Sequence, residues 1–335
     1  MREEFGKLPD GTPVERVTLA GGGLTARILT FGATIQDLRL TGHAPALVLG
    51  FETLADYLAH SRFFGVTPGR VANRIANGRF TLDGVEHALE CNERGVTHLH
   101  GGSDGLALRN WSIVDLADDH VTLEILDPAG RAGYPGNLTA RATYRLMPQG
   151  VLNVRYEAVT DAPTLANLCQ HSYFTLDGSQ DILDHELEIA AESYLPVDAR
   201  LIPLGHQQKV EGSAFDFRVS RPIRFEEAGA QVPYDHNFCL SAARVEKRPV
   251  ARVFSPLSGI TMQVATTEPG VQFYAGVYVN VPVPGLHGHL YGAYSGLCLE
   301  TQIWPDAINH PGFPNAVLRP GERLVQETDY SFQKS

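Results

Sequence analysis

Cysteine, charge and long apolar runs are all scarce in this 335-residue sequence. The four cysteines (Cys91, Cys169, Cys239 and Cys298) are scattered and form no CxxC pair, so metal clusters and redox motifs are unsupported and we expect reduced, buried thiols. No uncharged apolar run is long enough to span a bilayer. The first residues lack the apolar segment of a secretion signal, and we therefore expect a cytoplasmic location.

The charge that is present is mostly negative. Acidic residues number 38 and basic residues 27, which gives a net charge of −11. This balance argues against nucleic acid or an anionic membrane as a partner, and it selects no substrate. Hydrophobic residues make up 43% of the sequence, as in globular proteins without disorder.

Turn-forming residues and short alternating runs fill most of the sequence, with 33 glycines and 21 prolines. This pattern predicts an all-β protein, because no strands alternate with long helical segments. Residues 79–89 read as a hairpin turning at Asp83-Gly84, and Leu54–Ala59 as a short helix. Other predicted strands are Val17–Ala20, Leu24–Leu29, Ala33–Leu40, Val121–Leu126, Leu138–Leu146, Leu152–Thr160, His185–Ala190, Ala251–Ser255, Thr261–Thr266 and Val271–Val279. No linker-like break interrupts them, so we expect residues 1–335 to form one domain.

One predicted strand near the end of the sequence carries a carboxylate at its centre. Leu297, Leu299 and Thr301 alternate there with Cys298, Glu300 and Gln302. Such alternation indicates two unlike strand faces, and Glu300 shares its face with a small thiol and an amide. Because a buried charge is costly without a partner, Glu300 is expected to belong to a site.

Two further segments carry hydrogen-bonding groups. In residues 271–280, Gln272, Tyr274, Tyr278 and Asn280 form one face, typical of a sugar-sized cleft, although an ordinary solvent face remains the alternative. The Gly-bounded loop 69–78 holds Arg70 and Arg74 with two asparagines. Arginine grips carboxylates or sugar hydroxyls, but a solvated surface loop is equally open.

Histidines recur on predicted strands. His98 and His100 are two residues apart and should share a face, as metal ligands do in cupins. No glutamate and third histidine follow closely, which favours a hydrogen-bonded histidine pair over a metal site. His171 shares a face with Cys169 and Tyr173, and Asp235 precedes another strand; structural roles for both remain open.

Taken together, seven motifs in one order resemble the aldose 1-epimerase (galactose mutarotase) family, from about Phe31 to Tyr330. Seven ordered motifs are far more specific than any single one. They are Gly69–Ile75, Leu99–Gly102, Gly133–Gly136, His171–Phe174, Tyr234–Phe238, Gly270–Tyr274, and Glu300–Gln302 with Trp304–Asp306.

The resemblance implies a large antiparallel β-sandwich of the galactose mutarotase type with few short helices, an open cleft and no metal or cofactor. It implies an isomerase that interconverts the α and β anomers of free aldohexoses such as glucose or galactose. By position, Glu300 resembles the general base, His171 the general acid and His100 a second catalytic-site histidine. Sugar-binding roles fall on Asn73, Arg74, Ser172, Tyr173, Asp235 and Gln272. The partner would be a small sugar, and the protein a monomer or homodimer.

The chemistry requires a proton to leave the O1 hydroxyl and another to reach O5. An unperturbed glutamate is ionised at neutral pH and an unperturbed histidine titrates at about 6.5. We therefore expect Glu300 to be ready as a base and its surroundings to keep His171 protonated. Departures from the family pattern fall at Gln170, Thr175, residues 105–111 and His310. Two alternatives stay open, a sugar-phosphate epimerase and a non-catalytic carbohydrate-binding module.

Overall fold

The computed structural model describes residues 1–61 and 63–334. Within these residues the one α-helix is α1 (Leu54–His60), which confirms the predicted helix. Thr53 caps its first turn by accepting a hydrogen bond from the Asp56 amide at 3.2 Å. No helix in the described part of the chain is long and apolar enough to cross a membrane.

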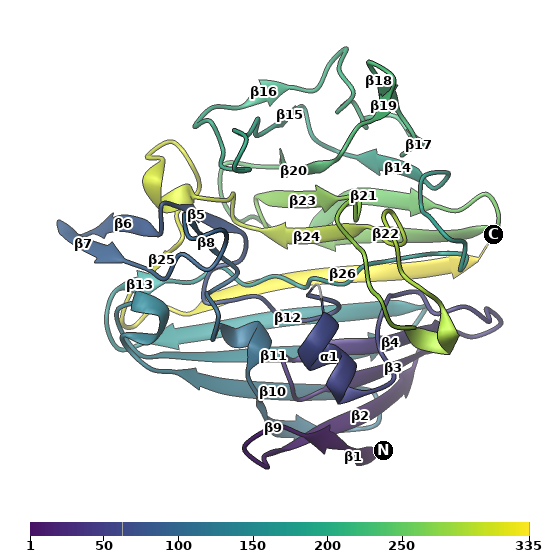
Figure 1. Ribbon diagram of the computed structural model, residues 1–335, viewed down its shortest axis with the longest axis horizontal. Coiled ribbons are helices and arrows are strands. Elements are labelled where there is room, and N and C mark those ends of the chain that lie inside the picture. Colours follow the sequence, from purple (N-terminus) through teal and green to yellow (C-terminus); the bar gives the residue numbers. More distant parts are fainter. Residues whose placement is uncertain (62, 335) are drawn as a thin grey trace.

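One layer of the molecule is a long antiparallel sheet whose central strands lie side by side in Figure 1. In sheet order its nine strands are β17 (Arg221–Pro222), β14 (Glu186–Ile189), β21 (Arg248–Phe254), β22 (Ile260–Thr266), β26 (Leu324–Lys334), β12 (Val151–Thr160), β11 (Leu138–Met147), β10 (His120–Asp127) and β9 (Ser112–Leu116). Buried and more exposed residues alternate along β11, as expected for a strand with one face in the core.

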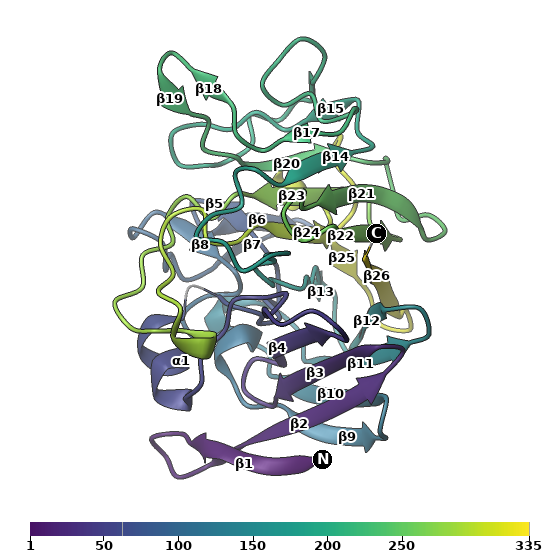
Figure 2. The same cartoon turned by 90° about the vertical axis from the view of Figure 1, so that its right-hand side faces the viewer.

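Two smaller antiparallel sheets provide the opposing layer. The first contains β1 (Arg2–Lys7), β2 (Pro13–Gly21), β3 (Leu24–Leu29) and β4 (Thr34–Leu40). The second contains, in order, β16 (Gln208–Lys209), β15 (Ser193–Tyr194), β20 (Asp235–Cys239), β23 (Gly270–Tyr274) and β24 (Cys298–Gln302). Figure 2 shows the amino-terminal sheet at one end of the molecule and β20, β23 and β24 toward the other.

Short pairs and turns complete the described fold. The pairs are β5 (Arg74–Ala76) with β8 (Thr97–Leu99), β6 (Arg79–Leu82) with β7 (Val85–Ala88), β13 (Thr164–Leu165) with β25 (Val317–Leu318), and β18 (Glu226–Glu227) with β19 (Ala230–Gln231). Four 3₁₀ turns are η1 (Leu106–Leu108), η2 (Arg131–Gly133), η3 (Leu286–Gly288) and η4 (Ala307–Asn309). The predicted hairpin is confirmed, and both Asp83 and Gly84 have the positive φ of a tight hairpin turn.

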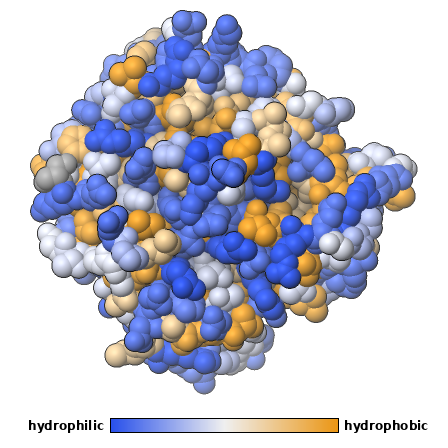
Figure 3. All heavy atoms as spheres, turned by 180° about the vertical axis from the view of Figure 1, so that it is seen from behind, coloured by the Kyte–Doolittle hydropathy of each residue, from blue (hydrophilic) through white to orange (hydrophobic). Residues whose placement is uncertain are grey.

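A continuous apolar core lies between the layers. Tyr144 of β11, Ile28 of β3 and Phe273 of β23 belong to one buried cluster, although they come from three different sheets. Each fully buried side chain of this size contributes roughly 1.5–3 kcal/mol through the hydrophobic effect. The result is the predicted all-β sandwich. The face seen from behind is largely hydrophilic, with apolar residues in small scattered patches (Figure 3).

Candidate active site

Strands β20, β23 and β24 of the five-stranded sheet turn a polar face away from the core. Gln272 pairs directly with Glu300 on one side and with Asn237 on the other, so the three side chains share this face. Phe273 and Leu299 point the opposite way, into the apolar core. Glu300 is the middle residue of β24 and is 2% exposed, as its alternating neighbours predicted.

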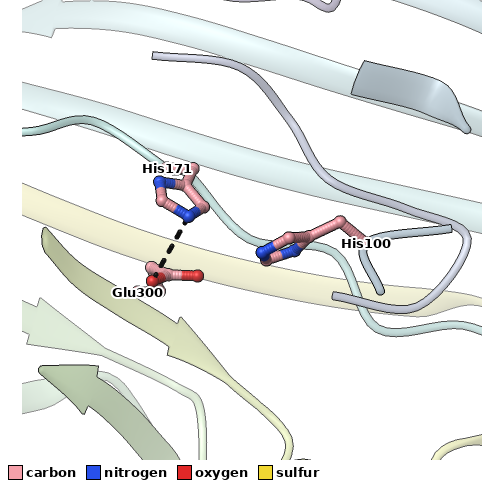
Figure 4. A group of neighbouring side chains, drawn as sticks. All are labelled: His100, His171 and Glu300. Carbon is pink, nitrogen blue, oxygen red and sulfur yellow. Dashed lines mark ion pairs between the residues drawn. The ribbon is translucent and has the colours of Figure 1, made fainter. Parts of the chain in front are cut away.

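His171 faces Glu300 from a segment far away in sequence. His171 Nε2 lies 3.6 Å from Glu300 Oε1, and Figure 4 shows the imidazole above the carboxylate with His100 reaching in from one side. The His171 backbone is held by the Val66 carbonyl and the Gly65 amide, both at 3.0 Å. The imidazole also stacks on Tyr173, with ring centroids 5.2 Å apart.

Burial changes the protonation expected for this pair. Burial, with the charge of Asp235 as a second cause, raises the pKa of Glu300 to about 8. Burial lowers the pKa of His171 to about 4. The expectation of an ionised Glu300 and a protonated His171 was therefore wrong. Between these limits the pair holds one proton, which burial places on Glu300.

His100 and Asn73 are locked together by backbone geometry. The Asn73 amide donates to His100 Nδ1 at 3.1 Å, and the His100 amide donates to the Asn73 carbonyl at 3.0 Å. Burial, and next the charge of His171, lowers the pKa of His100 well below its ordinary value. His100 is thus neutral with Nδ1 as the acceptor, so its proton sits on Nε2 as a hydrogen-bond donor.

A chain of charged and amide groups forms another wall of the site. Arg74 makes a two-pronged ion pair with Glu93, with Nε–Oε2 and Nη2–Oε1 distances both 2.8 Å. Gln272 Nε2 donates to Asp235 Oδ1 at 2.6 Å. Burial raises the pKa of Asp235, although the charge of Arg74 opposes the shift.

These groups surround an open cleft of about 220 Å³. It is lined by Phe63, Asn73, Arg74, Glu93, Leu99, His100, His171, Tyr173, Asp235, Tyr274, Tyr278, Val279 and Glu300. Seven of the nine catalytic and sugar-binding candidates from the sequence line this cleft. Of the other two, Gln272 donates a hydrogen bond to the cleft residue Asp235, and Ser172 does not reach the cleft. Mixed polar and aromatic lining of this size is suited to a small polar ligand.

Ser172 faces the core rather than the cleft. Successive side chains of an extended segment alternate, so His171 and Tyr173 point into the cleft while Ser172 points away. Its Oγ accepts a hydrogen bond from Gln170 Nε2 at 2.9 Å. Gln170 Oε1 in turn accepts from Tyr156 at 3.0 Å, which makes this departure from the family pattern part of a buried network.

The predicted strand Val271–Val279 was too long. β23 ends at Tyr274, because Gly276 turns the chain with φ 72° and an added Cβ there would lie 2.4 Å from the Gly296 carbonyl oxygen. Tyr278 reaches the cleft from the following loop and is 62% exposed.

The predicted histidine pair was also wrong. β8 ends at Leu99, and His98 points to Tyr134, whose hydroxyl lies 2.8 Å from His98 Nε2. His100 follows the strand with φ 53° and turns toward the cleft. The His98 imidazole therefore contacts Tyr134, whereas the His100 imidazole lines the cleft.

Arg70 is another residue that the cleft does not use. Its side chain is completely buried, with Nη2 2.8 Å from Asp127 Oδ2. The loop that carries Arg70 and Arg74 is consequently an interior anchor, not the solvated surface loop that stayed open on the sequence.

Some cleft residues gave no signal in the sequence. Phe63 and Glu93 lie in turns without a recognisable pattern, and their roles arise only through the fold. The position of Asp306 did carry a signal, since it follows the Trp304-Pro305 dipeptide of the family pattern. Its amide donates to the Arg74 carbonyl and its Oδ1 accepts from the Ala76 amide, both at 3.0 Å, so it holds β5 in place.

Among the described residues, one group of side chains has the donor atoms to hold a divalent cation. Donor atoms of His100, His171 and Glu300 lie within 4.8 Å of one another. His100 Nδ1 already accepts a hydrogen bond from the Asn73 amide, so Nε2 of the neutral imidazole carries the proton. The same three groups form a sufficient set of proton donors and acceptors for acid–base chemistry.

Fold and site together define a β-sandwich protein with a buried histidine–carboxylate pair in a polar cleft. A family model described as aldose 1-epimerase matches residues 15–331. Galactose mutarotase of Rattus norvegicus is 44% identical over 343 residues, covering 99% of this chain and 98% of the rat protein. Aldose 1-epimerase of Escherichia coli (strain K12) is 37% identical over 336 residues, covering 97% and 96%. The chain belongs to the aldose 1-epimerase family.

Solved structures give the same assignment. An aldose epimerase homologue from C. elegans superposes with a TM-score of 0.90 at 31% identity, covering 95% of this chain and 98% of that one. Galactose 1-epimerase from Lactobacillus acidophilus NCFM superposes with a TM-score of 0.85 at 28% identity, covering 100% and 98%.

Proposed function

We propose that this protein is a mutarotase that interconverts the α and β anomers of free aldohexoses such as galactose or glucose. The observation that supports this most strongly is the buried pair of His171 Nε2 and Glu300 Oε1, 3.6 Å apart beside a polar cleft. Relatives named galactose mutarotase and aldose 1-epimerase along almost the whole chain support the same reaction.

In the proposed reaction Glu300 removes the proton of the O1 hydroxyl while His171 delivers a proton to O5. The C1–O5 bond breaks, the O1 electrons form the aldehyde, and rotation about C1–C2 exposes the other face of C1. Return of both protons closes the ring as the opposite anomer. One proton enters and one leaves the enzyme in each direction. No bond forms between the enzyme and the sugar in this scheme.

The raised pKa of Glu300 and the lowered pKa of His171 suit this exchange. Burial makes Glu300 a stronger base and protonated His171 a stronger acid than either is in water. Ring opening leaves Glu300 protonated and His171 neutral, which is the arrangement that burial favours. The opposite arrangement, with Glu300 ionised and the proton on His171, must form before the pair can open the closed sugar ring.

Other groups of the cleft orient the sugar. His100 offers a neutral Nε2–H donor beside His171, whose ring centroid lies 5.1 Å away. Arg74 commits Nε and Nη2 to Glu93, and no hydrogen bond among the described residues uses its Nη1. We assign Arg74, Asp235 and Gln272 to sugar hydroxyls, Asn73 to holding His100, and Tyr173 to the wall beneath His171.

The charges of the cleft disfavour a sugar phosphate. Among the residues that the structure describes, Arg74 is the one lysine or arginine side chain that lines the cleft, and Glu93 pairs with that arginine. Glu93, Asp235 and Glu300 make three acidic groups around the same space. A phosphate needs an excess of cationic donors, and Arg70, the other candidate, is consumed by Asp127.

We also propose a single domain over residues 1–335, a monomer or homodimer, and a cytoplasmic location without nucleic acid or membrane partners. The apolar core shared by three sheets supports one domain. The net charge of −11 disfavours binding to nucleic acid or to an anionic membrane, because both are negatively charged.

The assay is optical rotation of freshly dissolved α-D-galactose and α-D-glucose, with glucose 6-phosphate as the phosphorylated arm. We expect the relaxation rate of the free sugars to rise in proportion to enzyme and that of the phosphate to change far less. Chelator-treated enzyme should retain its rate. An unchanged rate for free sugars that still bind would favour the non-catalytic module, and preference for the phosphate would favour the sugar-phosphate epimerase.

A further inference from the structure

Two buried thiols touch the outer atoms of the Glu300–His171 pair. Cys169 Sγ donates to Glu300 Oε2 at 3.4 Å, and Cys298 Sγ lies 3.6 Å from His171 Nδ1. Both cysteines are completely buried. The atoms that remain free of these contacts, Oε1 and Nε2, are the two that face each other.

The Cys298 thiol keeps its proton beside His171 Nδ1. Burial raises the pKa of the Cys298 thiol well above its ordinary value, so it keeps its proton. Tyr173 hydrogen-bonds to the same sulfur and opposes that shift, as a donor does. A protonated thiol 3.6 Å from His171 Nδ1 can donate to it, and a neutral imidazole that accepts at Nδ1 carries its proton on Nε2.

A thiol also suits the protonated state of His171. When the imidazole gains a second proton, Nδ1–H becomes a donor and the sulfur can accept it, because a thiol acts as weak donor and weak acceptor. An alanine at this position could do neither. A serine could do both, which provides a conservative replacement.

Cys169 acts on the carboxyl group in a similar way. Its bond to Oε2 fixes the rotation of the carboxyl group and leaves Oε1 toward His171. A thiol is a weaker donor than a hydroxyl, so it stabilises the carboxylate less. A strong donor at the same place would favour the charged form and weaken Glu300 as a base.

We propose that Cys169 and Cys298 are positioning residues that hold Oε1 of Glu300 and the protonated Nε2 of His171 toward the sugar. This inference rests on the proposed mutarotase function and adds two residues to it. Among the described residues, the charged and titratable groups that line the cleft or interact with the pair are Arg74, Glu93, His100, Cys169, Tyr173, Asp235, Tyr274, Tyr278, Cys298 and Tyr330.

The first test is kinetic. Cys298→Ala and Cys169→Ala should each lower kcat about three- to tenfold, the range that one hydrogen bond supplies, with KM little changed. Cys298→Ser should recover most of the rate. Cys169→Ser should lower the pH at which activity is lost on the alkaline side, because its hydroxyl stabilises ionised Glu300. Cys239→Ala is the matched control: Cys239 is buried in the same sheet, packs with Leu195 and Trp304, and should leave kcat unchanged.

The second test does not depend on activity. Imidazole ¹⁵N spectra of the full chain, assigned with His171→Asn, should show the Nε2–H tautomer of His171 at a pH between about 4 and about 8. Cys298→Ala should shift the signals toward a mixture of tautomers, and Cys298→Ser should not.

The outcomes separate the two proposals. Native kcat in both alanine variants, an unshifted alkaline limb in Cys169→Ser and an unchanged tautomer in Cys298→Ala would overturn the thiol assignment while mutarotation stands. If wild-type protein does not accelerate mutarotation, the proposed function fails, and the spectra alone decide whether Cys298 sets the tautomer. A loss of kcat that follows only a lower melting temperature, with both the pH limb and the tautomer unchanged, would also overturn it.

Discussion

At the scale of single residues, our proposal ties the pH dependence of catalysis to the proton shared between Glu300 and His171. Below about 4 both groups carry protons, so no base is present; above about 8 both have lost them, so no acid is present. We predict that kcat/KM follows a bell between these limits, with each limb assignable to the pair. An alkaline limb far below 8 would contradict the raised pKa of Glu300.

The ion pair between Arg74 and Glu93 gives a second residue-scale prediction. Glu93 accepts hydrogen bonds from two nitrogens of Arg74, so removing Glu93 should disorder the guanidinium and removing Arg74 deletes it; each change should raise KM about tenfold. Arg74→Ala, Glu93→Ala and the double variant form a cycle, in which the double variant should be little worse than Arg74→Ala. Full additivity would show that Glu93 acts independently of the arginine.

The sequence pointed to candidate residues with acid–base side chains, but it did not predict the burial that sets their protonation. Alternation around Glu300 predicted its face, whereas the reversed protonation of Glu300 and His171 depends on burial by segments distant in the chain. Ser172 was misplaced because the family motif gives a position but not the side to which an extended residue points. Glu93 had no local pattern, and its role exists only because the fold brings it to Arg74.

At the scale of elements, the packing of β20, β23 and β24 is predicted to be intolerant of bulk at Gly270. A Cβ there would lie 2.6 Å from Asn237 Oδ1 and 2.8 Å from Trp304 Cδ1, so Gly270→Ala should destabilise the protein by roughly 1–3 kcal/mol. Gly312→Ala is the control, because no atom lies within 4 Å of its added Cβ. Equal melting temperatures for the two variants would show that β20, β23 and β24 can shift to accommodate the methyl group.

Elements were predictable where local chemistry decides them. Asp83-Gly84 specified the β6–β7 hairpin, and residues 54–59 were recognised as the short helix α1. The end of β23 could not be found in this way, because alternation continues through Val277 and Val279. The strand stops where Gly276 passes close to Gly296, which is a contact between segments.

At the scale of the whole molecule, the buried ion pair between Arg70 and Asp127 joins the loop before β5 to the end of β10. Removing one partner leaves a charge uncompensated in the interior, and Asp127→Ala should cost roughly 3–5 kcal/mol of unfolding free energy. Glu124→Ala in the same strand removes only an exposed pair with Arg141 and should cost less than about 1 kcal/mol. Similar denaturant midpoints for the two variants would contradict this difference.

The all-β class could be predicted from the whole sequence because turn formers and short alternating runs continue throughout it. The arrangement of its sheets could not, since the order from β17 to β9 joins strands that are far apart in the chain. Ordered motifs bridged that gap, and the family relationship now rests on matches along nearly the whole length.

The central claim is that the buried pair of Glu300 and His171 exchanges the protons of mutarotation. Its most direct test is the polarimetric relaxation of freshly dissolved α-D-galactose with wild-type protein, Glu300→Gln and His171→Asn, each checked for native folding. We predict acceleration by the wild type and a loss of kcat of roughly 10²–10⁴-fold in each variant. Near-native kcat in folded Glu300→Gln and His171→Asn would contradict it.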